Sequence, residues 1–414
     1  MKRPLVFLAL IVAAPGLGCG SDLGRVSGDA HPSVRSAVET CSTEGAAARQ
    51  DCYEERLLAE LEASGVRPAL DMLAGIAAAD VDVQREAHVY THAIGIAHFD
   101  PDRPVAEVFA ECTELFQSGC YHGVIQAHFM ARGAPDEESV TTLCEPFKSS
   151  GEERFELFQC LHGLGHGLTM FYGHHLPRAL EDCDFLPDNW DRESCYGGVF
   201  MENVVAAISP HHVATELASE TRAAADAGDE HEHAMAMAMT AEDLEPFEPL
   251  RADDPHYPCS ILDVRYLTAC YLMQTSAMLH HNGQDFGHAA ESCAGAPESW
   301  RKTCFQSLGR DISAYTLQDH EDGLRACRQS PPEFRDFCYV GLVKNYVDLT
   351  ATTEDAFRFC TSIEEEYKAR CNQALGEQIG TLQATEAGRR QECARAESDV
   401  LERSCLYGAR VPVS

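Results

Sequence analysis

A short order of apolar and small positions recurs along the chain and predicts a series of equivalent helical segments. In six copies a cysteine is followed by an aromatic residue or leucine, then by any residue, and then by a small residue, and in three others Glu55, Met273 and Asn372 break this order at one position each. The order is found at Tyr121/Gly123, Leu161/Gly163, Tyr196/Gly198, Phe305/Ser307, Tyr339/Gly341 and Leu406/Gly408. A small residue at a fixed place in these six copies indicates that neighbouring helices approach each other closely there.

The segment DGLRACRQSPPEFRDFCYVGLVKNYVDL shows how one unit is built. A first helix is expected to end at Cys327, a Ser-Pro-Pro turn follows, and a second helix carries Cys338 in its first turns, because proline is tolerated at a helix start and disfavoured inside one. The C-terminal units begin at cysteines 259, 293, 327, 360 and 393, a period of 33 or 34 residues that is typical of helix–turn–helix repeats. The sequence therefore predicts an all-α, solenoid-like array of tandem helical hairpins.

The cysteine count supports the same architecture. The chain has 19 cysteines, and setting Cys19 aside leaves an even number, as expected for a disulfide framework in an exported protein. The order of the cysteines predicts nine local bridges: Cys41–Cys52, Cys112–Cys120, Cys144–Cys160, Cys183–Cys195, Cys259–Cys270, Cys293–Cys304, Cys327–Cys338, Cys360–Cys371 and Cys393–Cys405. Paired thiols binding a metal are the alternative, but no pair has the tight CxxC spacing of zinc sites.

The start of the chain predicts export. Lys2 and Arg3 precede an apolar run over residues 5–14 that is too short to span a bilayer, which is typical of a signal peptide. A small residue before Cys19 predicts lipidation of that cysteine, and Gly20 favours an outer-membrane lipoprotein that faces the periplasm or the surface. A soluble periplasmic or secreted protein is the expectation if Cys19 is not lipidated. The formal net charge of −34 argues against nucleic-acid binding.

Five segments are expected from these features. They are a signal peptide at 1–18, a flexible linker at 19–38, helical repeats with histidine-rich helices at 39–208, an acidic insertion at 209–257, and disulfide-stapled helical repeats at 258–414. The insertion contains an alternation of ligand-type residues, His231, His233, Met235, Met237 and Met239. Imidazole and thioether groups suit copper, so these residues are a secondary candidate metal site, with a biased sequence that binds nothing as the alternative.

The histidine-rich helices contain the main candidate site. Aligning AHVYTHAIGIAHFD with SGCYHGVIQAHFMA places Tyr90 where the other units have their second cysteine. Counted from that position, His92, His122 and His162 are equivalent in three successive units, so their imidazoles are expected to lie on neighbouring helices. His166 lies one helical turn after His162.

The next unit places Glu202 near the same level of the array. We therefore predict His162, His166, His122, Glu202 and His92 as ligands of a transition-metal ion, zinc, iron or copper. His174, His175, His280, His281 and His288 are weaker candidates because histidine doublets near turns are more often solvated. Histidines hydrogen-bonded in a packed core are the alternative for the whole set, and HGLGH lacks the glutamate of the metalloprotease motif HExxH.

Glycines surround the imidazoles in CLHGLGHGLTMFYGHH, although glycine weakens a helix by about 1 kcal/mol relative to alanine. One of them belongs to the repeat. Two others in the same helix, Gly165 and Gly167, indicate either space beside the imidazoles for a ligand or a close helix.

Four blocks, CLHGLGHGL, LPRALEDCDFL, CYGGVFMEN and ACYLMQTSAML, resemble an uncharacterised family of bacterial exported (lipo)proteins. The resemblance implies export but no particular activity. In shape alone the array is similar to Sel1-like and tetratricopeptide repeats, which bind peptides or partner proteins along a concave face.

Three functions are compatible with these features. The first is an exported, membrane-anchored repeat protein that binds a transition metal or small ligand at the histidine-rich helices. The second is a metal-free scaffold with a peptide, glycan or protein partner in the repeat groove. The third is a metal-dependent hydrolase or oxygenase, which would need an open coordination position and a substrate pocket. The sequence has no nucleophile elbow and no CxxCH motif, which argues against a serine hydrolase and a c-type haem protein. A protein that is not an enzyme is favoured.

Overall fold

The computed structural model describes residues 32–133, 135–148, 154–208 and 244–412, and these residues are all-α with no β-strand. One long helix forms the second half of each hairpin. The long helices are α2 (Ala46–Ser64), α4 (Val81–His98), α6 (Leu115–Arg132), α8 (Arg154–Phe171), α10 (Asn189–Ile208), α13 (Leu267–Asn282), α15 (Arg301–Tyr315), α17 (Pro332–Thr350), α19 (Glu365–Leu382) and α21 (Asp399–Gly408).

Shorter helices precede the long ones. They are α1 (Pro32–Cys41), α3 (Val66–Ala77), α5 (Val105–Phe109), α7 (Glu137–Thr142), α9 (Leu176–Cys183), α14 (Phe286–Gly295), α16 (His320–Cys327), α18 (Glu354–Ser362) and α20 (Glu386–Cys393), with 3₁₀ turns η1 (Glu145–Phe147), η2 (Val264–Tyr266) and η3 (Glu298–Trp300). The hairpin expected from the sequence is confirmed: α16 ends at Cys327, and α17 begins at Pro332.

All nine predicted disulfides are present, and each joins residues 8 to 16 positions apart in the sequence. In most hairpins the bridge ties the end of the short helix to the first turns of the long one. Closing a loop of this size contributes about 3 kcal/mol by restricting the unfolded chain. The hairpin of α3 and α4 has no bridge, and Tyr90 stands there, 2% exposed, in the core. Nine disulfides indicate a non-cytoplasmic, exported protein.

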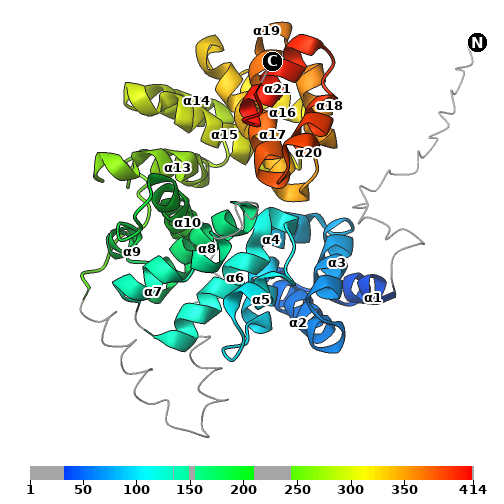
Figure 1. Cartoon of the computed structure of the whole chain (residues 1–414), viewed down its shortest axis with the longest axis vertical. Coiled ribbons are helices and arrows are strands. Elements are labelled where there is room, and N and C mark those ends of the chain that lie inside the picture. The colour runs from blue at the N-terminus through cyan, green and yellow to red at the C-terminus, as the bar shows by residue number, and fades with distance from the viewer. Residues whose placement is uncertain (1–31, 134, 149–153, 209–243, 413–414) are drawn as a thin grey trace, which may run out of the picture.

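Successive long helices pack side by side from α4 to α21. Figure 1 shows α1–α10 in the lower half of the view and α13–α21 in the upper half, connected where α10 meets α13. The array also returns on itself, because α17 packs against α6 and α19 touches α8. Two parts of the chain more than 200 residues apart are therefore in direct contact.

Pairs of glycines bring the long helices into backbone contact. A Cβ atom at Gly165 would lie 2.1 Å from the carbonyl oxygen of Cys195, and one at Gly198 would lie 1.9 Å from that of His162. The same reciprocal arrangement recurs at Gly95/Gly123, Gly309/Gly341 and Gly376/Gly408. A Cβ at Gly167 would meet the ring of Phe129 at 2.6 Å. Gly165 and Gly167 therefore serve close helix packing, and the alternative of open space beside the imidazoles is wrong.

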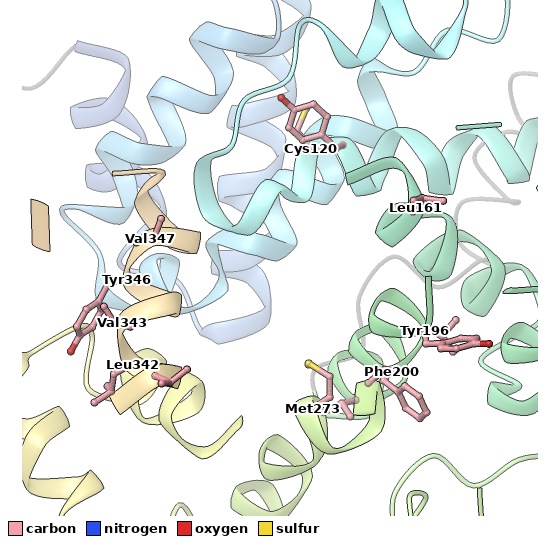
Figure 2. Close-up of a cluster of buried hydrophobic side chains, with 14 of the residues drawn as sticks. Cys120, Leu161, Tyr196, Phe200, Met273, Leu342, Val343, Tyr346 and Val347 are labelled. Atoms are coloured by element: carbon pink, nitrogen blue, oxygen red, sulfur yellow. The ribbon is translucent and has the colours of Figure 1, made fainter. Parts of the chain in front are cut away.

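The hydrophobic core is continuous along the stack. Figure 2 shows Leu342, Val343, Tyr346 and Val347 of α17 at one side of the core, and Tyr196, Phe200 and Met273 from α10 and α13 at the other. These side chains are at most 7% exposed. Burial on this scale fixes the position of each long helix, and with it the position of any polar group that the helix carries.

Two expected boundaries differ from the structure. The linker expected at 19–38 already contains α1 from Pro32, because Val34, Ala37 and Val38 form one apolar face that is buried against the repeats. The last part of the segment at 209–257 is not helical, but it is packed: Leu250 and Tyr257 are buried. None of the helices in the described ranges combines the length and apolarity needed to cross a membrane.

Candidate metal centre

Helices α4, α6 and α8 bring a group of imidazoles together, and α10 adds the carboxylate of Glu202. The three equivalent histidines of the repeat are neighbours, as their register predicted: the ring centroids of His92 and His122 are 5.4 Å apart, and those of His122 and His162 are 5.0 Å apart. His166 stacks on His122 at 4.8 Å. We call His88, His92, His122, His162, His166 and Glu202 the histidine cluster.

His88 belongs to the cluster although the sequence analysis missed it. Its ring lies 4.5 Å from that of His92, and the two Nε2 atoms are 3.1 Å apart. The signal was present in the sequence, since His88 and His92 have the same i, i+4 spacing as His162 and His166. The register was counted forward from Tyr90, which takes the place of the second cysteine in this unit, and His88 precedes Tyr90.

The Nε2 atoms of His88 and His92 contact each other, and the Nδ1 atom of each ring donates a hydrogen bond to another residue. His88 Nδ1 donates to the carbonyl oxygen of Phe116 at 2.8 Å, and His92 Nδ1 donates to Oε1 of Gln126 at 3.0 Å. The two Nε2 atoms face each other at 3.1 Å, a distance at which they can share a proton or lie beside a common metal ion.

His122 and His166 are held in the same way. His122 Nε2 donates to Oε1 of Gln159 at 3.1 Å, and His166 Nδ1 donates to Oε2 of Glu202 at 2.8 Å. The second nitrogens, His122 Nδ1 and His166 Nε2, are buried and have no hydrogen-bond partner among the described residues. A buried polar atom without a partner costs about 1–3 kcal/mol, so these two atoms need an explanation.

Burial favours the neutral form of three imidazoles of the cluster, those of His92, His122 and His162. Desolvation, followed by the charges of the neighbouring imidazoles, holds the pKa of His92, His122 and His162 well below the ordinary value of 6.5. A neutral imidazole offers a lone pair without first having to lose a proton, which is the form that a metal ion binds.

Glu202 accepts hydrogen bonds that orient side chains of the cluster. It is completely buried, and it accepts hydrogen bonds from His166 Nδ1, from His174 Nε2 at 3.2 Å and from Gln126 Nε2 at 3.4 Å. Because Gln126 in turn holds His92, one carboxylate sets the orientation of two imidazoles. This is the arrangement by which carboxylates orient metal-binding histidines.

The spacing of the donors fits a metal ion. Three overlapping sets each place one possible ligand atom per residue within 4.8 Å of the others: His88/His92/His122, His122/His162/His166 and His92/His166/Glu202. The centroids of the His88, His92, His122 and His166 rings are 4.5 to 6.4 Å apart. Four imidazoles around a tetrahedral ion at about 2.0–2.1 Å from each nitrogen have centroids about 5 Å apart.

The weaker candidates lie at the periphery of the histidine cluster or outside it. His174 reaches Glu202 but no ring of the cluster, and His175 caps α9 by accepting from the amide of Arg178. His281 and His288 line a separate small cavity beside α13 and α14. Cys19 and the candidate copper ligands His231, His233, Met235, Met237 and Met239 lie outside the described residues.

Comparison with known proteins adds no relative: no protein-family model matches the chain, and no curated protein or solved structure is significantly similar to it. The resemblance to a family of exported (lipo)proteins therefore stays a prediction.

Proposed function

We propose that the protein binds one divalent transition-metal ion between His88, His92, His122 and His166. The observation that supports this most strongly is the pair of buried nitrogens without hydrogen-bond partners, His122 Nδ1 and His166 Nε2, in the same cluster as the close Nε2 pair of His88 and His92. A metal ion would give His122 Nδ1 and His166 Nε2 a partner, while the opposite nitrogen of each ring keeps its hydrogen-bond acceptor.

This ligand set modifies the one expected from the sequence. His88 is added, and Glu202 becomes a positioning residue, because both of its oxygens are already used by hydrogen-bond donors. His162 forms a hydrogen bond with the backbone of Ser194. At 8% exposure it is the most exposed of the four histidines predicted as ligands from the sequence, so we place it at the edge of the site.

The donor set and the burial define the kind of metal site. Imidazole nitrogens suit zinc, copper, iron and nickel, and disfavour calcium and magnesium. Three of the four proposed ligands, His92, His122 and His166, are 1–2% exposed, and His88 is partly exposed, so most of the site is closed to a substrate. A closed site is typical of structural or storage roles, which favours a metal-binding protein that is not an enzyme. We further propose that it is exported and anchored to a membrane by a lipid at Cys19.

Elemental analysis of the purified protein tests this proposal. We expect about one equivalent of transition metal per chain, lost in a His122→Ala/His166→Ala variant. The matched control is His280→Ala/His281→Ala, which removes two histidines outside the cluster and is expected to keep the metal. Circular dichroism must show that both variants remain helical. Absence of metal from the wild type, even after dialysis against Zn²⁺, would overturn the proposal and favour the metal-free scaffold.

A further inference from the structure

Three consecutive residues of α6 have left-handed backbone conformations. The φ angles of Phe116, Gln117 and Ser118 are 51°, 58° and 61°. None of them is glycine, and the left-handed conformation costs roughly 1–2 kcal/mol for each such residue. A run of this kind persists only where surrounding contacts hold it in place. We call residues 116–118 the left-handed turn.

On one side the left-handed turn is attached to the histidine cluster. The carbonyl oxygen of Phe116 accepts the hydrogen bond of His88 Nδ1 at 2.8 Å. Immediately after the turn, Gly119 lies flush against α4: a Cβ atom there would be 2.0 Å from Oγ1 of Thr91 and 2.9 Å from the ring of His92. The path of the backbone at the turn therefore depends on where His88 and His92 sit.

On the other side the turn contacts the returning half of the array. Gln117 Nε2 donates to Oδ1 of Asn345 on α17 at 3.0 Å. Asn345 is 1% exposed and donates in turn to Oγ of Ser313 on α15 at 3.0 Å. A second contact, from Gln84 of α4 to Gln318 at 3.4 Å, lies one turn before His88. Both contacts with the C-terminal half of the array therefore lie close in sequence to His88 and to the left-handed turn.

We propose that the left-handed turn couples metal binding in the histidine cluster to the contact between α6 and α17. The inference rests on the proposed function, since it requires an ion at the cluster. A bound ion fixes the ring of His88, whose Nδ1–H then holds the carbonyl of Phe116 and keeps the turn left-handed. Without the ion, the turn is free to relax toward right-handed helix, which moves Gln117 away from Asn345.

The coupling is reciprocal by thermodynamic necessity. If the metal ion stabilises the contact between Gln117 and Asn345, then loss of that contact must weaken metal binding by the same factor. Coupling free energies between sites typically correspond to changes of 5- to 150-fold in affinity. We expect the lower part of that range, because a single hydrogen bond transmits the effect.

Amide hydrogen exchange of the full-length protein, metal-free and loaded with Zn²⁺, tests the coupling. In the wild type we expect Zn²⁺ to slow exchange in α17 as well as around the cluster. In Gln117→Ala, which leaves every proposed ligand intact, Zn²⁺ should still bind, several-fold more weakly, and exchange in α17 should no longer respond to it. The matched control is Gln378→Ala, because Gln378 also contacts α17, at Lys344 and Asp348, but from α19.

The outcomes separate the two proposals. If the wild type does not bind Zn²⁺, the proposed function fails. If Zn²⁺ binds but exchange in α17 is unchanged, the coupling is wrong while metal binding stands. If Gln117→Ala responds to Zn²⁺ as fully as the wild type and Gln378→Ala do, the path through Gln117 is refuted.

Discussion

A methyl group at position 198 is expected to separate the two central helices of the histidine cluster. In Gly198→Ala the new Cβ would lie 1.9 Å from the carbonyl oxygen of His162 and 3.2 Å from Cα of Gly165. Ordinary contacts of a Cβ begin near 3.4 Å. Since 3.4 − 1.9 = 1.5 Å, α8 and α10 must move apart by about that distance. Both partners are helix backbone, so no side-chain rotation can relieve the overlap.

The cost follows from the contacts that this movement breaks. Overpacking a well-packed core typically costs 1–3 kcal/mol, and we expect the upper end, about 3 kcal/mol, because two rigid helices must shift. Amides of α8 and α10 exchange when the two helices separate. A loss of about 3 kcal/mol should speed their hydrogen exchange by about 100-fold. The separation also lengthens the 2.8 Å bond between His166 and Glu202, and losing such an orienting bond typically weakens metal affinity by 10- to 100-fold.

Hydrogen exchange read by mass spectrometry measures the effect locally. Peptides from α8 and α10 should exchange faster in Gly198→Ala, while peptides from α21 provide an internal reference, because α21 packs against α19 and α20. Gly45→Ala is the control, because a Cβ there has no atom within 4 Å. Unchanged exchange in α8 and α10 of the Gly198→Ala protein would refute the argument that backbone contact fixes this helix pair.

Three further changes have expected outcomes. Replacing Cys327 and Cys338 by alanine should lower the free energy of unfolding by about 3 kcal/mol in guanidinium titrations, with the loss confined to the neighbouring hairpins. Desolvation lowers the pKa of the His128 side chain to about 4, so between pH 6.5 and pH 4 the unfolded chain binds a proton that the folded chain does not. Stability should therefore fall as the pH drops through that window, by up to about 3 kcal/mol, and His128→Phe should reduce the slope in denaturation curves measured from pH 7 to pH 4. Finally, Glu202→Gln should weaken Zn²⁺ binding by about 10- to 100-fold in competition with a chelator, because an amide cannot accept from all the donors that the carboxylate serves; equal affinity would show that Glu202 does not orient the ligands.

The local organisation of the chain could be predicted from the sequence because it depends on short separations. Cysteines such as Cys327 and Cys338 lie 11 residues apart, so a bridge between them closes a small loop at the turn of a hairpin. Pro332 could only begin a helix. The register of His92, His122 and His162 could be counted from the cysteine positions, because equivalent positions of stacked repeats become neighbours.

The tertiary structure alone decided how the helices face one another. The pairing of Gly165 with Cys195 and of Gly198 with His162 depends on the rotation of each helix about its axis, which side-chain packing sets. The position of the His88 ring brings it into the cluster, and the position of the Glu202 carboxylate makes it a group that orients His166. Sequence spacing does not specify either position. The return of α17 onto α6 results from small rotations added over many repeats, so no local segment encodes it. The left-handed turn at residues 116–118 exists because contacts from both halves of the array meet there and outweigh the intrinsic preference of its residues for right-handed helix.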